Sequence, residues 1–113
     1  MPSEFPEGRI AEWLDEMWLH AREYRHIILV SHTPPLDTSC DRLRDGRHVG
    51  SSAVREFIME HQPDICLCGH IHESRSEDKL GKTVIVNPGR LDDGGYAILT
   101  LGDKPVVKPY LLT

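Results

Sequence analysis

The chain has 113 residues, which predicts a single domain over residues 1–113, and its 39% hydrophobic content is typical of a globular rather than a disordered protein. Its 13 basic and 18 acidic side chains give a formal net charge of −5, which argues against a basic face that binds nucleic acid. No apolar run is long enough to span a membrane, and the start of the chain lacks the basic and apolar regions of a secretory signal.

The first predicted element is an amphipathic helix that begins near Gly8. Apolar residues recur there at helical spacing, and the expected buried stripe consists of Ile10, Trp13, Leu14, Met17, Ala21 and Tyr24. Trp18 lies outside this stripe, so we expect a wide apolar arc. Residues 26–30 form a continuous, β-branched apolar run, which predicts a short, fully buried strand that ends before Pro34 and Pro35.

Residues 36–50 are polar and lack periodicity, which predicts a loop; at about 15 residues it is long enough to suggest a function. Ser51 or Ser52 can cap a second helix that buries Val54, Phe57 and Ile58. Residues 64–68 predict a second strand, parallel to the first because a helix separates the two. Four further strands are expected, in a largely antiparallel arrangement, over residues 73–77, 82–86, 96–101 and 106–112.

The cysteine count is odd, with Cys40, Cys66 and Cys68, and no secretory signal precedes them. We therefore expect free thiols and a cytoplasmic, reducing compartment. A zinc site built from Cys66, Cys68 and His70 is an alternative interpretation. It is disfavoured because structural zinc sites separate their first pair of ligands by two to four residues, and a core strand already explains the two thiols.

Histidines directly follow both predicted parallel strands: His32 after the first, and His70 and His72 after the second. Because ligands gather beyond the carboxyl ends of parallel strands, we expect three imidazoles to converge there. Neutral imidazole is a good ligand for several transition metals. The ordinary alternative, an exposed histidine with no role, is preferred for the histidines that lack such a context: His20, His26 and His61.

Three motifs together resemble the carboxyl-terminal half of a calcineurin-like metallophosphoesterase. They are Val30-Ser31-His32-Thr33-Pro34-Pro35, Cys68-Gly69-His70-Ile71-His72-Glu73 and Val86-Asn87-Pro88-Gly89. The resemblance extends from His26 to Leu112. It implies an α/β fold, half of a four-layer α/β/β/α sandwich with a mixed sheet and two helices. It also implies a hydrolase that cleaves phosphomonoesters or phosphodiesters with a water activated by two divalent metal ions, manganese, iron or zinc.

By the family pattern, His32 and His70 would bind one metal ion and His72 the other. The family's Asp-x-His, its bridging Asp and its Gly-Asn-His are absent from this sequence, and Arg90 stands where the family more often has Ser. No residue of this chain is therefore predicted to be catalytic. We expect the site to be incomplete on its own and to bind one ion weakly.

Arg47 and His48 are the predicted substrate contacts, because guanidinium groups suit phosphate oxygens. The alternative is a solvated loop in which neighbouring Asp residues pair with the arginines. Asn87 is a third substrate-site candidate, although we expect it mainly to fix the adjacent loop. The remaining ligands would come from a second chain or a second copy of this one, with a phosphoester as substrate. A non-catalytic metal-binding or protein-interaction module, or a relic without a role, is the alternative.

Overall fold

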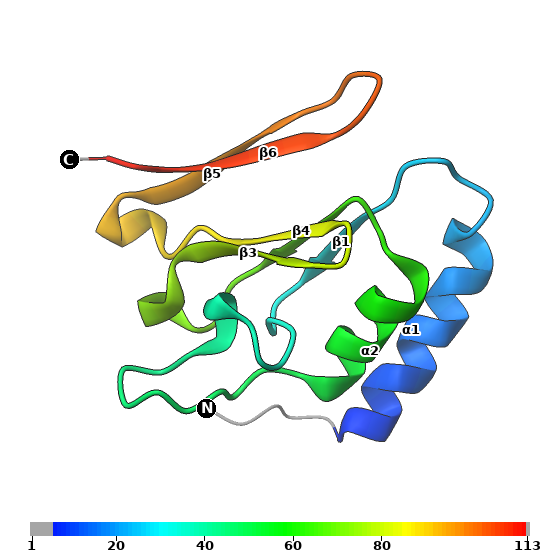
Figure 1. Cartoon of the computed structure of the whole chain (residues 1–113), viewed down its shortest axis with the longest axis horizontal. Coiled ribbons are helices and arrows are strands. Elements are labelled where there is room, and N and C mark those ends of the chain that lie inside the picture. Colours follow the sequence, from blue (N-terminus) through cyan, green and yellow to red (C-terminus); the bar gives the residue numbers. More distant parts are fainter. Residues whose placement is uncertain (1–5, 113) are drawn as a thin grey trace.

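The computed structural model describes residues 6–112, and two helices and six strands form most of this region (Figure 1). The helices are α1 (Glu7–Ala21) and α2 (Ser52–His61). The strands are β1 (Ile28–Ser31), β2 (Ile65–Cys68), β3 (Ser76–Leu80), β4 (Thr83–Asn87), β5 (Gly95–Thr100) and β6 (Val106–Leu111). Short 3-10 turns are η1 (Ser39–Asp41), η2 (His72–Ser74) and η3 (Leu91–Asp93). No helix in residues 6–112 has the length and apolar character needed to cross a membrane.

The central sheet has four strands in the order β1-β2-β4-β3. Strands β1, β2 and β4 are parallel, and β3 runs antiparallel to β4. The predicted parallel pairing of the first two strands is therefore confirmed, with Ile28 opposite Ile65 and Ser31 opposite Cys68. Strands β5 and β6 form a separate antiparallel hairpin.

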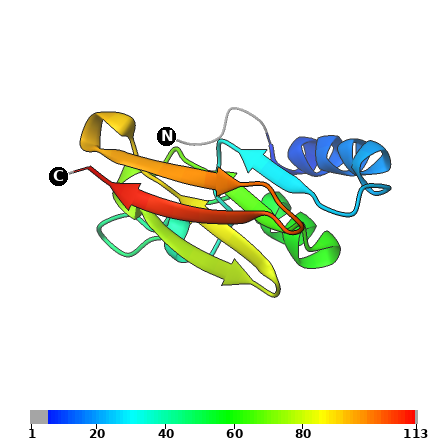
Figure 2. The same ribbon diagram turned by 90° about the horizontal axis from the view of Figure 1, so that it is seen from above.

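The described chain has three layers, because the two faces of the sheet are covered by different elements (Figure 1), and Figure 2 looks down on them from the side of the hairpin. The helices pack on one face and the β5–β6 hairpin lies over the other. Period-two alternation explains this division, since Leu29 and Cys66 face the helices while Ile28 and Ile65 face the hairpin. The expected mixed sheet with two helices is confirmed.

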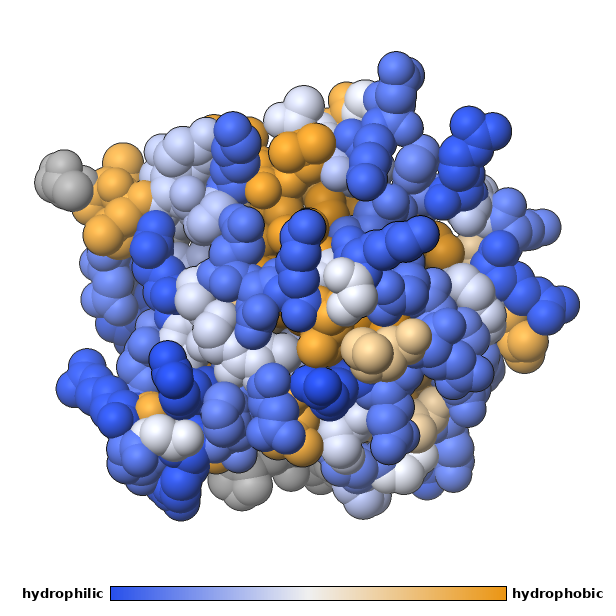
Figure 3. All heavy atoms as spheres, viewed as in Figure 1, coloured by the Kyte–Doolittle hydropathy of each residue, from blue (hydrophilic) through white to orange (hydrophobic). Residues whose placement is uncertain are grey.

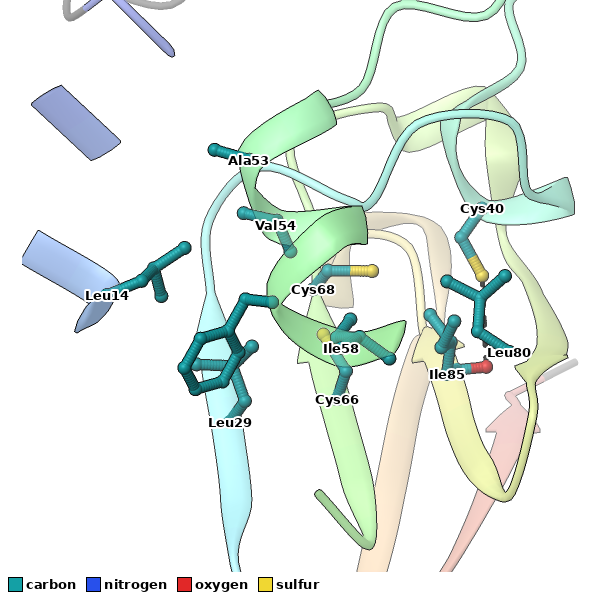
Figure 4. Close-up of a cluster of buried hydrophobic side chains, with 11 residues drawn as sticks. Leu14, Leu29, Cys40, Ala53, Val54, Ile58, Cys66, Cys68, Leu80 and Ile85 are labelled. Atoms are coloured by element: carbon teal, nitrogen blue, oxygen red, sulfur yellow. Dashed lines mark hydrogen bonds between the residues drawn. The ribbon is translucent and has the colours of Figure 1, made fainter. Parts of the chain in front are cut away.

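The larger core lies between α2 and the sheet (Figure 4). Val54, Phe57 and Ile58 are buried on α2, as the sequence predicts. Ser51 caps this helix by accepting a hydrogen bond from the Val54 amide at 3.1 Å. Burial of this apolar face supplies most of the stabilisation available to a helix of only ten residues.

Helix α1 buries a different side from the expected stripe. Its contacts with the core come from Ile10, Ala11, Leu14 and Trp18, while Trp13 is 46% exposed. Trp18 packs edge-on against Phe57, with ring centroids 5.9 Å apart, and stacks on His61 at 4.1 Å. The prediction was wrong in rotation, because α1 packs mainly on α2 and the large Trp18 ring fills that interface.

Strand β1 is an edge strand, so the expectation that it is fully buried was wrong. Leu29 is buried beneath the helices, but Val30 on the opposite face is 74% exposed. The hairpin covers Ile28 and Leu67 without reaching the carboxyl end of β1. Within the described residues, an edge of the sheet with no pairing strand and an exposed apolar side chain therefore meet beside His32.

The predicted loop over residues 36–50 is ordered by contacts at its base and within it. Ser51 donates a backbone hydrogen bond to the Pro34 carbonyl at 2.8 Å and accepts one from the Leu36 amide at 3.1 Å. Gly50 permits this close approach, since a Cβ atom there would lie 2.5 Å from the Pro34 carbonyl oxygen. The segment is therefore a closed surface loop that carries η1.

Candidate functional site

Two of the predicted metal ligands meet at the carboxyl ends of β1 and β2. The Nε2 atom of His32 lies 2.9 Å from Nδ1 of His70, and the ring centroids are 4.6 Å apart. Parallel pairing of Ser31 with Cys68 brings the two strand ends together, and the Gly69 amide donates to the His32 carbonyl at 3.2 Å. At least one of the facing nitrogens is unprotonated, because one must accept the hydrogen bond.

His70 has a left-handed backbone with φ of +62°. This conformation is uncommon outside glycine and costs about 1 kcal/mol or more when a larger residue adopts it. Neighbouring interactions hold the strained turn in place: the Ile71 amide bonds the Gly69 carbonyl at 2.6 Å, and the Ser74 amide bonds the Ile71 carbonyl at 3.0 Å. Strain that surrounding structure maintains is a common feature of ligand sites.

Asn87 is fully buried at the end of β4 and holds this turn in place through hydrogen bonds. Its Nδ2 group donates to the carbonyls of Ile71 at 2.8 Å and Cys40 at 3.1 Å, while its Oδ1 accepts from the Gly89 amide at 3.1 Å. All of these contacts are to backbone. Of its two expected roles, the contacts correspond to fixing the loop that lies between His70 and His72.

His72 begins η2 and is exposed. Within residues 6–112 no group of three or more His, Cys, Asp or Glu side chains is arranged to hold a metal ion. The described chain therefore supplies a facing pair of nitrogens at His32 and His70. The assignment of His72 to a second ion stays a prediction.

A pocket of about 490 Å³ opens beside His70. Thr33, Leu43 and Arg47 line it together with His70. Arg47 is one of the predicted substrate contacts, and its Nε also lies 2.8 Å from Oδ2 of Asp45 in an exposed ion pair. Hydrogen bonds from Arg47, first from its backbone and then from its side chain, lower the pKa of Asp45. Arg47 therefore both lines the pocket and pairs with an Asp of its own loop, and its role as a substrate contact stays a prediction.

His48 is exposed on the loop, and its Nδ1 atom lies 2.6 Å from Oδ1 of the fully buried Asp41. The hydrogen bond to Asp41 raises the pKa of His48, partly opposed by desolvation. Sequence reasoning missed the importance of Asp41. The signal was available, because Thr38 and Asp41 have the spacing of a capping box, which the structure forms around η1.

The three cysteines are free and buried, and they belong to the core between α2 and the sheet (Figure 4). A hydrogen bond with Cys68 is the main cause that lowers the pKa of Cys40 to about 7, while the same contact and burial raise the pKa of Cys68. Cys68 also donates to the Val86 carbonyl at 3.5 Å. The core-strand interpretation of Cys66 and Cys68 is thus confirmed.

This fold and this pair of histidines define a metallophosphoesterase-type domain. The sequence model of the metallophosphoesterases of the calcineurin superfamily matches residues 4–109. The chain belongs to this family.

Two curated relatives illustrate the match. An uncharacterized protein of Methanocaldococcus jannaschii, MJ1162, is 42% identical over 91 residues, which are 77% of this chain and 40% of that protein. The 3',5'-cyclic adenosine monophosphate phosphodiesterase CpdA of Escherichia coli is 29% identical over 89 residues, which are 74% of this chain and 32% of CpdA. The chain thus spans less than half the length of either relative.

Two solved structures share the fold. One superposes with a TM-score of 0.74 at 24% identity, covering 96% of this chain and 41% of the other. The second, TT1561 of Thermus thermophilus, has a TM-score of 0.56 at 18% identity and covers 98% of this chain and 47% of its own. At these identities the likeness supports the fold alone.

The donor set fits part of a divalent metal site. Nitrogen atoms 2.9 Å apart can both approach one ion at the usual Zn–N distance of about 2.0–2.1 Å. Imidazole nitrogens suit the transition metals that the family uses. Two ligands do not complete a coordination shell, and within residues 6–112 no third His, Cys, Asp or Glu side chain joins them in a metal-binding group.

Proposed function

We propose that this chain contributes the His32–His70 part of a metal-dependent phosphoester hydrolase. The proposal depends above all on the 2.9 Å separation between the two imidazole nitrogens at the ends of adjacent parallel strands. Family membership supports hydrolysis of a phosphoester, and the likeness to CpdA favours a phosphodiester. Manganese, iron and zinc are the candidate metals, and His72 is the candidate ligand of a second ion.

When bound, the divalent metal would supply positive charge that activates water and stabilises the phosphoryl oxygens. The residues of this chain position that chemistry. His32 and His70 present neutral nitrogen donors, and the strained turn at His70 keeps its ring against His32. Asn87 holds the turn through Ile71, while Arg47 offers a guanidinium group to an anionic substrate in the adjoining pocket.

We further propose that a second polypeptide segment completes the ligand set. The exposed edge of β1 lies beside His32 and could receive it. The described chain offers only two facing donors, and the curated relatives are more than twice as long as the matched region. A cytoplasmic location is part of this proposal, because the three free thiols suit a reducing compartment.

The alternative function is a metal-binding or interaction module without catalysis. It is favoured by one observation, the absence of any carboxylate in a metal-ready cluster within residues 6–112. Carboxylates commonly bridge paired metal ions, and without one the two cations would repel each other at short range. The two functions share the histidine pair and differ in turnover.

Metal binding to the purified chain tests the histidine pair that both functions require. Calorimetry with Mn²⁺ or Zn²⁺ is expected to show weak binding of fewer than two ions, reduced on the order of tenfold or more in His32→Ala and in His70→Ala. His20→Ala is the matched control, because His20 is exposed on α1 away from the site. Equal binding by all four proteins would contradict the proposed ligands.

Hydrolysis of an aryl phosphodiester with added Mn²⁺ separates the two functions. The chain alone is expected to show little turnover, and addition of the completing segment should restore it in wild type but not in His70→Ala. Robust turnover by the chain alone, abolished by His70→Ala, would show that the site is already complete. Metal binding without turnover in the completed assembly would favour the non-catalytic module.

A further inference from the structure

A second pocket, of about 400 Å³, lies between the turn at residues 42–46 and the segment 73–76 that follows His72. Three arginines line it: Arg42, Arg44 and Arg75. The lining contains one carboxylate, that of Glu73. This is an unusual local excess of positive charge for a chain whose formal net charge is −5.

Three guanidinium groups and one carboxylate leave the pocket lining with a net positive charge. Among residues 6–112, the arginines with a carboxylate within 4 Å are Arg47 and Arg90, and none of the pocket arginines forms such a pair. The Glu73 carboxylate already accepts the Arg44 backbone amide at 2.6 Å. Like charges gathered around one hollow repel each other, and a bound anion would remove that repulsion.

Contacts between the two walls give the pocket a fixed shape. The Ser74 hydroxyl donates to the Arg42 carbonyl, and the Arg44 amide donates to Glu73 across the pocket. Arg75 is held along its stem by Gly89, where an added Cβ would lie 3.3 Å from the Arg75 Cβ, Cγ and Cδ atoms. The backbone walls of the pocket are thus held before a ligand arrives, which reduces the entropy lost on binding, while the three arginine side chains are exposed to solvent.

The pocket adjoins the proposed metal site. Leu43 lines both this pocket and the one beside His70, so the turn at residues 42–46 separates the two. Segment 70–74 joins them on the other side, because His70 and Ile71 line the first pocket while Glu73 and Ser74 line the second. The lower-left part of the molecule in Figure 1, which holds this turn and η2, has a mainly hydrophilic surface (Figure 3).

From these observations we infer that the arginine pocket, defined by Arg42, Arg44 and Arg75, binds a phosphate group. Guanidinium forks donate paired hydrogen bonds to phosphate oxygens, which makes them the preferred side chains for this anion. Resting on the proposed function, the inference extends to the substrate: a phosphoester whose second phosphate occupies this pocket while the first lies beside His70.

Inorganic phosphate in the presence of EDTA and low salt tests the pocket without any metal chemistry. Titration followed by calorimetry or by amide NMR shifts is expected to show binding that weakens about tenfold in Arg42→Gln and in Arg75→Gln. Arg42→Lys and Arg75→Lys should recover part of the loss, because they restore charge without the fork. Added NaCl should weaken binding in wild type.

Arg22→Gln is the matched control, because it removes the same positive charge from an exposed arginine at the end of α1. It should bind phosphate like wild type. A similar loss in Arg22→Gln would show diffuse attraction to the whole surface and would overturn the inference, as would the absence of phosphate binding to wild type. The stem of Arg75 packs on Gly89, so Arg75→Gln could disturb the fold. Arg42 has no such contact with Gly89, so a loss of phosphate binding in Arg42→Gln is free of this artefact.

Fructose 6-phosphate and fructose 1,6-bisphosphate test the extension to the substrate. With Mn²⁺ present, the bisphosphate is expected to bind more tightly than the monophosphate, and Arg75→Gln should abolish the difference. Equal affinities would confine the pocket to free phosphate and overturn the extension. Failure of metal binding at His32 and His70 would contradict the proposed function but would not change phosphate binding in EDTA. The failure of the proposed function and the failure of the arginine pocket are therefore distinguishable.

Discussion

At the scale of single residues, the Asp41 carboxylate organises the loop above the site. It is fully buried and accepts the backbone amides of Asp37 at 3.0 Å, Thr38 at 3.1 Å and Gly50 at 2.9 Å, besides the ring of His48. Amide donors left unpaired in a buried position cost about 1–3 kcal/mol each. One carboxylate therefore joins residues 37–38 before η1 to residues 48–50 at the far end of the loop.

His48 makes the stability of this loop depend on pH. The pKa of His48 is raised, mainly by its hydrogen bond to Asp41. Desolvation lowers this pKa, the negative charges of Asp41 and Asp37 raise it, and the positive charge of Arg42 lowers it. A raised pKa in the folded state means that protonation stabilises the fold. The contribution is complete below the ordinary histidine value of about 6.5 and is lost as pH rises through the raised folded value.

The free energy of unfolding of His48→Gln, measured in urea, is therefore expected to lie furthest below that of wild type at about pH 5.5. At about pH 8.5 the two values should approach each other. Val49→Ala is the matched control, because Val49 is an exposed neighbour that does not titrate. Its difference from wild type should be the same at both pH values. A gap for His48→Gln that widens toward alkaline pH would contradict the assignment.

At the scale of elements, Glu7 ties the first turn of α1 to the first turn of α2. Its Oε1 accepts the Ser51 hydroxyl at 2.6 Å, the Ser52 hydroxyl at 3.2 Å and the Ala53 amide at 2.9 Å. Burial alone would raise the pKa of Glu7, but these hydrogen bonds outweigh it and the pKa is lowered. The carboxylate also lies at the positive end of the α2 dipole.

Glu7→Ala is expected to lower the free energy of unfolding by about 1 kcal/mol at neutral pH, the usual cost of losing a helix cap. Because the folded pKa is lowered, the contribution is present above the ordinary glutamate value of about 4.3 and fades as pH falls through the folded value. Denaturant unfolding at about pH 7 and about pH 3 measures both effects.

Glu12→Ala provides the comparison on the same helix, since Glu12 is exposed. Its effect should stay within about 0.5 kcal/mol. If both glutamates gave the same small change at neutral pH, Glu7 would not link the helices in solution.

At the scale of the whole molecule, β1 is an edge strand, and no other strand among residues 6–112 pairs with its outer side. Val30 is 74% exposed there, and the hairpin leaves it uncovered. Unpaired strand edges with apolar side chains favour association with another chain. The same edge carries His32 at its carboxyl end, so pairing along β1 would bring new side chains to the candidate metal site.

Sedimentation equilibrium of the purified chain is accordingly expected to show concentration-dependent association, and Val30→Lys should shift it toward monomer. Lysine on an edge strand blocks pairing while its long side chain tolerates exposure. Ile98→Lys is the control, because Ile98 is also exposed, at 51%, but belongs to the hairpin. A wild-type chain that stays monomeric over the whole concentration range would refute the prediction.

Local sequence patterns predicted the elements well where one signal dominated. Ser51 caps α2, Val54 and Phe57 are buried, and β2 is a continuous apolar strand, as expected. Rotation of α1 was mispredicted because Leu14 fits both possible stripes, and only the neighbouring helix selects the side that includes Trp18. The exposure of Val30 likewise depends on where the hairpin ends in space, which periodicity along β1 does not encode.

The sequence by itself determined the family, the parallel pairing of the first two strands and the edge of the sheet at which His32 and His70 lie, because strand ends follow from local pattern and the pairing from chain connectivity. Tertiary structure decided how the side chains meet: the 2.9 Å contact between the two imidazoles, the burial of Asp41 under the loop and the arginine pocket. Each of these joins segments that are distant along the chain, and their separation in space depends on packing, which spacing in the sequence does not specify.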